Sequence, residues 1–281
     1  MISPEALFQC LQNLSEGCPL VHGITNLVTM TDCANALLAA GASPVMASAP
    51  EEAAEVTQRS DGLFINLGTP DRERFMAMES ACRAAQQRHI PVVLDPAGVG
   101  LSDFRYRFAL QILSQNQITA IRGNAAEIAT LLGDRRGRGV DCDDSAVLRD
   151  NAVERNLAVM AARRFRCLVV MTGETDLISD GLRVAAVRHG HPLMRLVTGM
   201  GCMFTALLTA FLAVNRGRPF EAAVSLACAY GLCGEESAAR ALAGQGGPGS
   251  FRTSFTDGLF RLRDRDPELF RHARFEEFSL A

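Results

Sequence analysis

The sequence predicts one α/β domain with three layers, in which helices cover both faces of a central, mostly parallel sheet that has a short antiparallel edge. Short apolar runs alternate with amphipathic stretches of roughly 10–18 residues, the length of helices that connect parallel strands. The chain has 281 residues, enough for one or two domains. It shows no internal repeat and no composition typical of a linker. We therefore interpret residues 1–281 as a single domain.

Six apolar runs are the candidate strands of the parallel part, and polar or glycine residues follow most of them. These runs are residues 19–24, 43–48, 63–68, 91–96, 119–124 and 167–173. Two further short runs within residues 176–190 are joined at Asp180-Gly181, which is typical of a β-hairpin. They predict the antiparallel edge of the sheet.

Local signals mark the ends of several helices. Ser3 and Pro4 suit the cap and first position of an N-terminal helix, and Gly41 suits the C-terminal cap of a helix over residues 26–40. Two further helix starts are indicated at residues 49–52 and 69–71.

After Met200 the chain is predicted to be almost wholly helical to its end, with residues 244–249 as a loop between helices. Residues 135–139 are predicted to form an exposed loop. The longest apolar stretch is too short to span a bilayer, and the N-terminus lacks the basic and apolar segments of a signal peptide. We expect no association with a membrane.

Composition excludes several classes of protein. Lys plus Arg number 28 against 31 Asp plus Glu, a net charge of −3 that argues against nucleic-acid binding. The chain contains no lysine, which excludes a Walker A loop, a pyridoxal-phosphate Schiff base, a lysine aldolase and a protein-kinase lysine. Nine cysteines without CxxC spacing predict buried, reduced thiols in the cytoplasm and disfavour structural zinc.

The ends of the candidate strands are the expected place for a site, because open parallel sheets bind ligands beyond the carboxyl ends of their strands. The polar and flexible residues found there are 22–26, Met46, 66–69, 95–96, 122–124 and 172–173. A single strand end needs a turn residue in any case. Six such ends along one edge favour a ligand site.

The strongest local signal is VTGMGC, residues 197–202, before a long apolar helix. Gly199 and Gly201 allow a close approach of the backbone, and the free N–H groups of the first helical turn favour an anion. The alternative is a glycine turn that only caps a buried helix.

Asp95 and Glu127 follow neighbouring candidate strands, and two carboxylates there could hold Mg²⁺ together with phosphate oxygens. Asp95 could instead cap a turn, and Glu127 could form a capping box with Asn124. The pair His189 and His191 has no third ligand in phase and is interpreted as a solvated turn. The acidic residues at 141–144 lack the pattern of a calcium loop.

Taken together, six segments resemble the hydroxyethylthiazole kinases, the thiamine-salvage family of the ribokinase-like superfamily. The segments are residues 21–52, 65–69, 92–100, 121–133, 169–181 and 197–213. The resemblance implies transfer of the γ-phosphate of ATP to the primary alcohol of 4-methyl-5-(2-hydroxyethyl)thiazole, with Mg²⁺ required. It also implies a homotrimer whose thiazole pockets lie between neighbouring subunits.

The resemblance carries over roles to particular residues. Three fall at thiazole-binding positions: Met46, Gly199 and Asn26. Three fall at ATP-binding positions: Arg122, Thr172 and Asn124. Two fall in the metal–phosphate network: Asp95 and Glu127.

Cys202 falls where most ribokinase-like enzymes have an aspartate as catalytic base, and the resemblance implies that role for its thiol. A helix N-terminus lowers the pKa of a cysteine, so we expect a lowered pKa here. Met200 stands where this family often has threonine, which adds bulk beside the proposed anion site.

Two other functions stay open. One is a ribokinase-like kinase for another small alcohol, such as a hydroxymethylpyrimidine. The other is a non-catalytic thiazole- or nucleotide-binding protein, which the cysteine at position 202 would motivate. A repair dehydratase of the same superfamily finds no support in the sequence.

Overall fold

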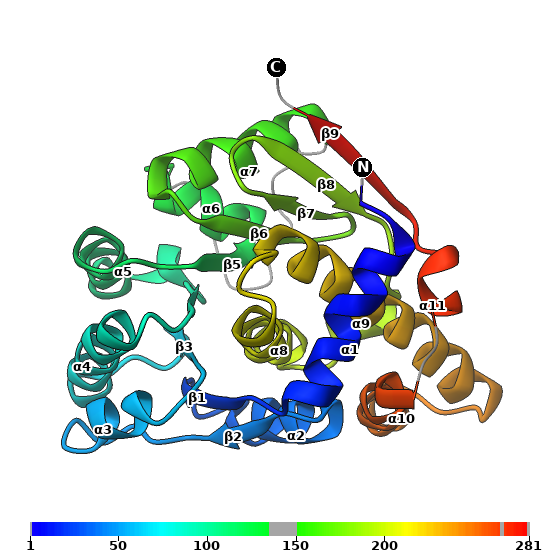
Figure 1. The fold of residues 1–281 in the computed structure, drawn as a ribbon, viewed down its shortest axis with the longest axis horizontal. Helices are drawn as coiled ribbons and strands as arrows, with labels where there is room; N and C mark the ends of the chain where they lie inside the picture. Colours follow the sequence, from blue (N-terminus) through cyan, green and yellow to red (C-terminus); the bar gives the residue numbers. More distant parts are fainter. Residues whose placement is uncertain (1, 135–150, 265–266, 280–281) are drawn as a thin grey trace.

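The structure is a computed structural model that describes residues 2–134, 151–264 and 267–279 (Figure 1). Their strands form one sheet in the order β2-β1-β3-β4-β5-β6-β7-β8-β9. The strands are β1 Leu20–Ile24, β2 Ser43–Val45, β3 Gly62–Asn66, β4 Val92–Asp95, β5 Ala120–Asn124, β6 Leu168–Thr172, β7 Asp176–Ser179, β8 Arg183–Val187 and β9 Phe275–Ser279. The first six pair in parallel and the last three are added antiparallel. The predicted mostly parallel sheet with an antiparallel edge is thus confirmed.

Helices cover both faces of this sheet. They are α1 Pro4–Gly17, α2 Met30–Ala40, α3 Ala53–Gln58, α4 Arg72–Arg88, α5 Asp103–Gln115, α6 Ala125–Leu131, α7 Asn151–Phe165, α8 Met200–Val214, α9 Pro219–Ala243, α10 Pro248–Arg261 and α11 Glu268–Arg271. One apolar cluster joins α3 to α7 to one face, and a second joins α1, α2 and α8 to α11 to the other. None of the helices in the described ranges is long and apolar enough to cross a membrane.

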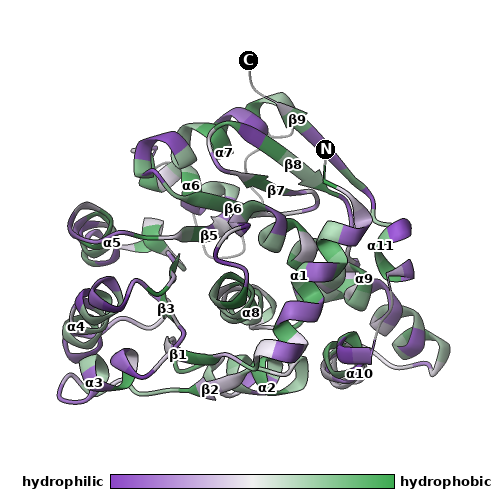
Figure 2. Ribbon diagram, viewed as in Figure 1, coloured by the Kyte–Doolittle hydropathy of each residue, from purple (hydrophilic) through white to green (hydrophobic). Residues whose placement is uncertain are grey.

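Two buried layers exist because neighbouring residues of a strand point to opposite faces of a sheet. In β3, Phe64 packs in the cluster with α8, whereas Leu63 and Ile65 pack in the cluster with α4. Helix α8 itself is coloured as apolar over most of its length and lies in the middle of the molecule (Figure 2). The sheet and α8 therefore form a rigid support for whatever lies at their shared edge.

Most predicted helix ends are confirmed. The Ser3 side chain accepts from the N–H of Ala6 with Pro4 at the first position, and Gly41 adopts φ +96° at the end of α2. Helix α2 begins at Met30 and not at residue 26. The reason is that the Asn26 side chain accepts from the N–H groups of Val28 and Thr29 and closes a turn there.

The expectation of an almost wholly helical segment after Met200 is wrong at its end, where β9 pairs with β8. Phe275 and Phe278 are separated by two glutamates and pack against different apolar clusters, on opposite faces of the sheet. Such a short strand depends on its pairing with a neighbouring strand. The loop predicted at residues 244–249 is confirmed only as far as Gly247, since α10 begins at Pro248. The loop predicted at residues 135–139 and the acidic residues at 141–144 lie outside the described residues.

His189 is not a solvated turn residue, in contrast to the interpretation from sequence. Its side chain is 1% exposed, and its Nδ1 lies 3.2 Å from Oε1 of Glu235. Its Nε2 accepts from the backbone N–H of Arg274 at 2.8 Å. The carboxylate comes from α9, far along the chain, so local spacing could not indicate it.

Candidate active site

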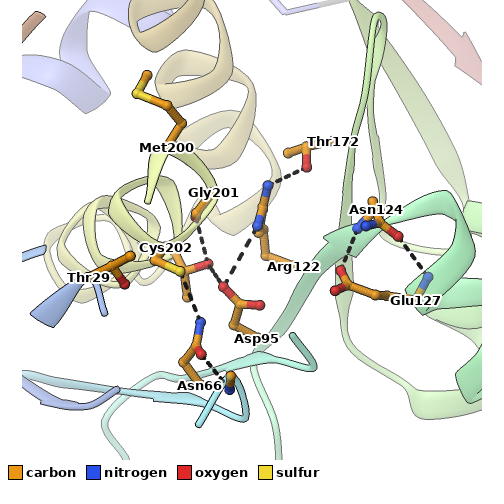
Figure 3. A network of polar contacts seen from close by, with 12 residues as sticks. Thr29, Asn66, Asp95, Arg122, Asn124, Glu127, Thr172, Met200, Gly201 and Cys202 are labelled. Carbon is orange, nitrogen blue, oxygen red and sulfur yellow. Dashed lines mark hydrogen bonds and ion pairs between the residues drawn. The ribbon is translucent and has the colours of Figure 1, made fainter. Parts of the chain in front are cut away.

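The carboxyl ends of β1, β3, β4, β5 and β6 meet the N-terminus of α8 at one edge of the sheet. In the close view, Arg122 and Asp95 lie between Cys202 on one side and the pair Asn124 and Glu127 on the other (Figure 3). Most of the residues expected to form the site thus come together in one polar network.

Asp95, the last residue of β4, is buried at the centre of this network, with 1% of its surface exposed. Its Oδ2 accepts from the hydroxyl of Thr205 at 2.7 Å and lies 3.7 Å from Nη1 of Arg122. Burial raises the pKa of the Asp95 carboxyl, and the charge of Arg122 and the hydrogen bonds oppose that rise. A cation close to Asp95 therefore stabilises the charged form of a carboxyl group that burial alone would keep neutral.

Arg122, on β5, turns its guanidinium toward α8. Nη2 donates to the hydroxyl of Thr172, at the end of β6. A Cβ atom at Gly201 would lie 2.3 Å from Nη1, so the guanidinium packs directly against the first turn of α8. Its Nε is buried and has no hydrogen-bond partner among the described residues. The cation thus lies where the first-turn N–H groups of a helix would otherwise attract an anion.

Asn124 and Glu127 form the capping box of α6. The Asn124 side chain accepts from the N–H of Glu127 at 2.8 Å, and Glu127 Oε2 accepts from the N–H of Asn124 at 2.9 Å. Glu127 Oε1 accepts from the N–H of Gly98, in the turn after β4. Burial, and then the charge of Asp95, raise the pKa of Glu127 to about 7. The capping role is confirmed, and it leaves the carboxylate beside a second buried acid.

Cys202 lies in the first turn of α8, where its Sγ accepts from two amide groups. Asn26 Nδ2 is 3.2 Å away and Asn66 Nδ2 is 3.4 Å away. Burial and the nearby charge of Asp95 raise the pKa of the Cys202 thiol above its usual value. The expectation of a lowered pKa is therefore wrong, because desolvation and the charge of Asp95 outweigh the hydrogen bonds from Thr29 and Asn26 and the charge of Arg122.

Asn26 and Gly199 lie close to Cys202. Asn26 donates to Oδ1 of Asn66 at 3.1 Å and accepts from the hydroxyl of Thr29. Gly199 adopts φ +91°, and a Cβ there would lie 3.2 Å from the Cβ of Thr29. Glycine is thus required at position 199 both for the backbone conformation and for the space beside α2.

Met46 directly follows β2 and packs against the same apolar cluster as Cys202. A Cβ atom at Gly23 would lie 2.8 Å from the sulfur of Met46, so the methionine lies over β1. It supplies an apolar surface on the side of the sheet that carries α8.

Several polar residues of the site were given no role from the sequence, although residues 66–69 were placed at a strand end. Asn66 ends β3 and contacts Cys202, and it could have been given a role from its place at a strand end. Thr205 and Tyr230 lie inside apolar helical runs, so nothing in the sequence indicated that they belong to a polar site. The Tyr230 hydroxyl donates to the carbonyl of Met200 at 2.6 Å, so α9 holds the start of α8. Asp176 accepts from the N–H of Gly173, and burial raises its pKa to about 6.

The donor set fits Mg²⁺ of the kind that takes most of its ligands from phosphate and water. Asp95 and Glu127 are buried carboxylates with raised pKa values, and the charge of Asp95 contributes to the raised pKa of Glu127. A cation would relieve that repulsion. Within the described ranges no group of three or more His, Cys, Asp or Glu side chains could hold a metal by itself.

The fold is that of the ribokinase-like proteins. A ribokinase-like superfamily protein from Enterococcus faecalis superposes with a TM-score of 0.60 over 93% of this chain and 95% of that chain, at 12% identity. At such low identity the likeness shows the fold alone.

Closer relatives are more specific. The model of the hydroxyethylthiazole kinase family matches residues 11–265. A hydroxyethylthiazole kinase from Thermoanaerobacter pseudethanolicus is 40% identical over 96% of this chain and 99% of its own length. One from Methanosarcina acetivorans is 41% identical over 95% of this chain and 98% of its own length. The structure of the hydroxyethylthiazole kinase from Pyrococcus horikoshii superposes with a TM-score of 0.86, at 38% identity, over 98% of this chain and all of that one. The chain belongs to the hydroxyethylthiazole kinase family.

Proposed function

We propose that the protein transfers the γ-phosphate of ATP to the primary alcohol of 4-methyl-5-(2-hydroxyethyl)thiazole, giving the thiazole phosphate for thiamine synthesis. Membership of the family supports the reaction and the acceptor. The observation that carries the proposal is the meeting of Arg122, the N-terminus of α8 and Asp95 at one sheet edge. Phosphoryl transfer needs such positioned charge more than it needs covalent chemistry.

ATP is held by Arg122, Thr172 and Asn124 in this proposal. Arg122 keeps its charge at every ordinary pH, so it offsets phosphate charge without titrating. The N–H groups of residues 200–202 face the transferring group and stabilise its oxygens, as an oxyanion hole does. Glycine at position 201 supports the role of Arg122, because a side chain there would push the guanidinium away from the start of α8.

Asp95 and Glu127 would hold Mg²⁺, the cation that the reaction uses to neutralise phosphate charge. Their two carboxylates lie on adjacent elements, at the end of β4 and in the first turn of α6. Thr205 and the N–H of Gly98 fix the orientation of the two carboxylates.

The thiazole alcohol is bound by Met46, Gly199 and Asn26. Its hydroxyl oxygen forms the new bond to the γ-phosphorus while the bond from that phosphorus to the oxygen bridging to the β-phosphate breaks, and ADP leaves. The proton of the hydroxyl passes to Sγ of Cys202. Since the pKa of this thiol is raised, only a small fraction is thiolate at neutral pH. A loose transition state asks little of a base, so the step tolerates this.

The proposal includes a homotrimer with each thiazole pocket at a subunit interface. Leu27 and Val28, beside Asn26, are 63% and 65% exposed, and large apolar side chains next to a binding site favour cover by another subunit. A cytoplasmic location is also proposed, supported by the free thiols of the cysteines in the described residues.

The test is a coupled assay of ADP formation with ATP, Mg²⁺ and the thiazole alcohol, with a hydroxymethylpyrimidine as the parallel acceptor. Thiazole-dependent ADP formation is expected. Turnover of the pyrimidine alone would point to a different acceptor. Thiazole binding by calorimetry without any turnover would make the protein a binding protein and refute the proposed reaction.

A further inference from the structure

His22, in the middle of β1, is fully buried and makes two hydrogen bonds on the α3 side of the sheet. Its Nε2 lies 2.7 Å from the carbonyl of Ala47, and its Nδ1 lies 2.8 Å from the hydroxyl of Thr57 in α3. A carbonyl can only accept, so Nε2 carries the proton of this bond. Burial lowers the pKa of His22 and so favours the neutral ring. The Thr57 hydroxyl, which donates to the carbonyl of Ala53 at 2.8 Å, lies against Nδ1 of this ring.

Gly23, the next residue of β1, faces the opposite side of the sheet, where α8 lies. The parallel register pairs Val21 with Pro44 and His22 with Val45, so Met46 arrives beside Gly23. A Cβ atom at Gly23 would lie 2.4 Å from the ring of Phe64 and 2.8 Å from the sulfur of Met46. The side chain of Met46 therefore rests in the space that the glycine leaves.

Strand β2 ends at Val45 and pairs with β1 alone, because it lies at the edge of the sheet. The ladder of backbone hydrogen bonds therefore stops before Met46. The next tie to β1 is the bond from His22 to the carbonyl of Ala47, one residue beyond Met46. Two adjacent residues of β1 thus position Met46 from opposite faces of the sheet. Gly23 leaves space for its side chain, and His22 binds the backbone carbonyl of the residue that follows it.

We propose that His22 is a positioning residue for the acceptor site, which fixes Met46 over Gly23 and so sets the affinity for the apolar ring of the acceptor alcohol. The inference rests on the proposed function, because it takes Met46 as a contact of the acceptor. His22 itself does not touch the reacting atoms. Loss of the His22 side chain should therefore weaken binding of the acceptor alcohol and leave binding of ATP unchanged.

The experiment compares three variants. His22→Asn reaches only to the place of Nδ1 and leaves the Ala47 carbonyl without its donor. His22→Gln extends to the place of Nε2 and keeps a donor for that carbonyl. Thr57→Val is the matched control, because it removes the other bond of the ring and leaves the bond to Ala47.

In His22→Asn the KM for the thiazole alcohol should rise about tenfold, the factor that corresponds to about 1.4 kcal/mol. The KM for ATP and kcat should stay within about twofold of the parent, which separates lost ground-state binding from lost catalysis. His22→Gln and Thr57→Val should stay within about threefold of the parent KM. A misfolded fraction would lower the apparent kcat but not KM, so the ratio of KM values reports on the folded enzyme.

A double-mutant cycle shows whether His22 acts through Met46. On a Met46→Ala background, His22→Asn should add less than about twofold to the thiazole KM, because residues that act as one unit are not additive. Additive effects, or an unchanged KM in His22→Asn, would overturn the role of His22 while leaving the reaction in place. Absence of thiazole-dependent turnover in the parent enzyme would instead refute the proposed function, and the role of His22 with it.

Discussion

Replacing Cys202 with aspartate is expected to raise kcat at neutral pH. The pKa of the thiol is raised above its usual value of 9.0. A group with that usual value would be about 1% ionised at pH 7, and Cys202 is ionised less than this. If thiolate is the base, kcat of the parent enzyme should rise by close to tenfold for each pH unit through neutrality.

The magnitude for the aspartate variant follows from two opposed effects. Asp95 and burial would raise the pKa of an aspartate at this position from its usual value of about 4, but as long as it stays below neutrality most of the carboxyl is ionised at pH 7, against less than about 1% of the thiol, a gain of up to about 100-fold in the fraction of base. A carboxylate is also a weaker base than a thiolate, which offsets part of that gain. We expect a kcat that is a few-fold to about tenfold higher at pH 7, and a pH profile that flattens above neutrality.

The assay is kcat for the parent, Cys202→Asp, Cys202→Ser and Cys202→Ala from pH 6 to 9, with saturating substrates. The alanine and serine variants should keep ATP binding and lose much of kcat. Full activity in the alanine variant would remove Cys202 from the mechanism and leave catalysis to positioning, metal and the helix terminus. A parent profile that is flat across this range would refute the reasoning from the raised pKa.

Further predictions concern the carboxylates, the start of α8 and the assembly. Asp95→Ala and Glu127→Ala should raise the Mg²⁺ concentration for half-maximal activity by about tenfold or more, with a smaller change in thiazole binding; normal activity at limiting Mg²⁺ would make the residue a cap only. The raised pKa of Glu127 favours its protonated form in the folded chain, so that stabilisation is complete below its usual value of 4.5 and is lost as pH rises through about 7. Glu127→Gln should therefore raise Tm more, or lower it less, at pH 8 than at pH 5 in metal-free buffer, and an equal change at both would contradict this. Tyr230→Phe removes the hydroxyl that donates to Met200 and should cost about 1 kcal/mol in denaturant unfolding, together with a fall in kcat; unchanged values in both would show that α8 needs no such support. Sedimentation at falling protein concentration should show loss of thiazole binding as a trimer dissociates, and an active monomer would rule the interface site out.

The sequence predicts the parallel strands well because their apolar runs are buried on both faces, as in LFIN before Leu67 and VVLD before Pro96. Strand β9 was missed because its five residues, FEEFS, include two adjacent glutamates and show no apolar alternation. Such a strand depends on its partner β8, which no local pattern shows.

Within the site, the positions of the sequence motifs predicted which residues lie close together. They did not predict how these residues shift one another's pKa values. The pKa of Cys202 follows from burial and from Asp95, which is 107 positions away in the sequence and adjacent only in the fold. Glu127 was left open between capping and metal binding, and the capping box is present without removing its carboxylate from the site. Outside the site, His189 follows β8 and its partner Glu235 lies in α9, so their contact had no signal in spacing.

The cluster of raised acids around Arg122 has a consequence for how the site responds to its surroundings. The acidic groups around Arg122 are Asp95, Glu127, Asp176 and Cys202, and the pKa of each is raised, to about 7 for Glu127 and about 6 for Asp176. The chain has no lysine, and an arginine does not titrate, so none of the site's cations is lost as pH rises. Alkalinisation can therefore only add negative charge to these groups. Each proton released as pH rises should increase the affinity of the site for a metal cation and decrease its affinity for a metal-free polyphosphate. With rising pH the site should therefore increasingly prefer the metal complex of the nucleotide over the free nucleotide.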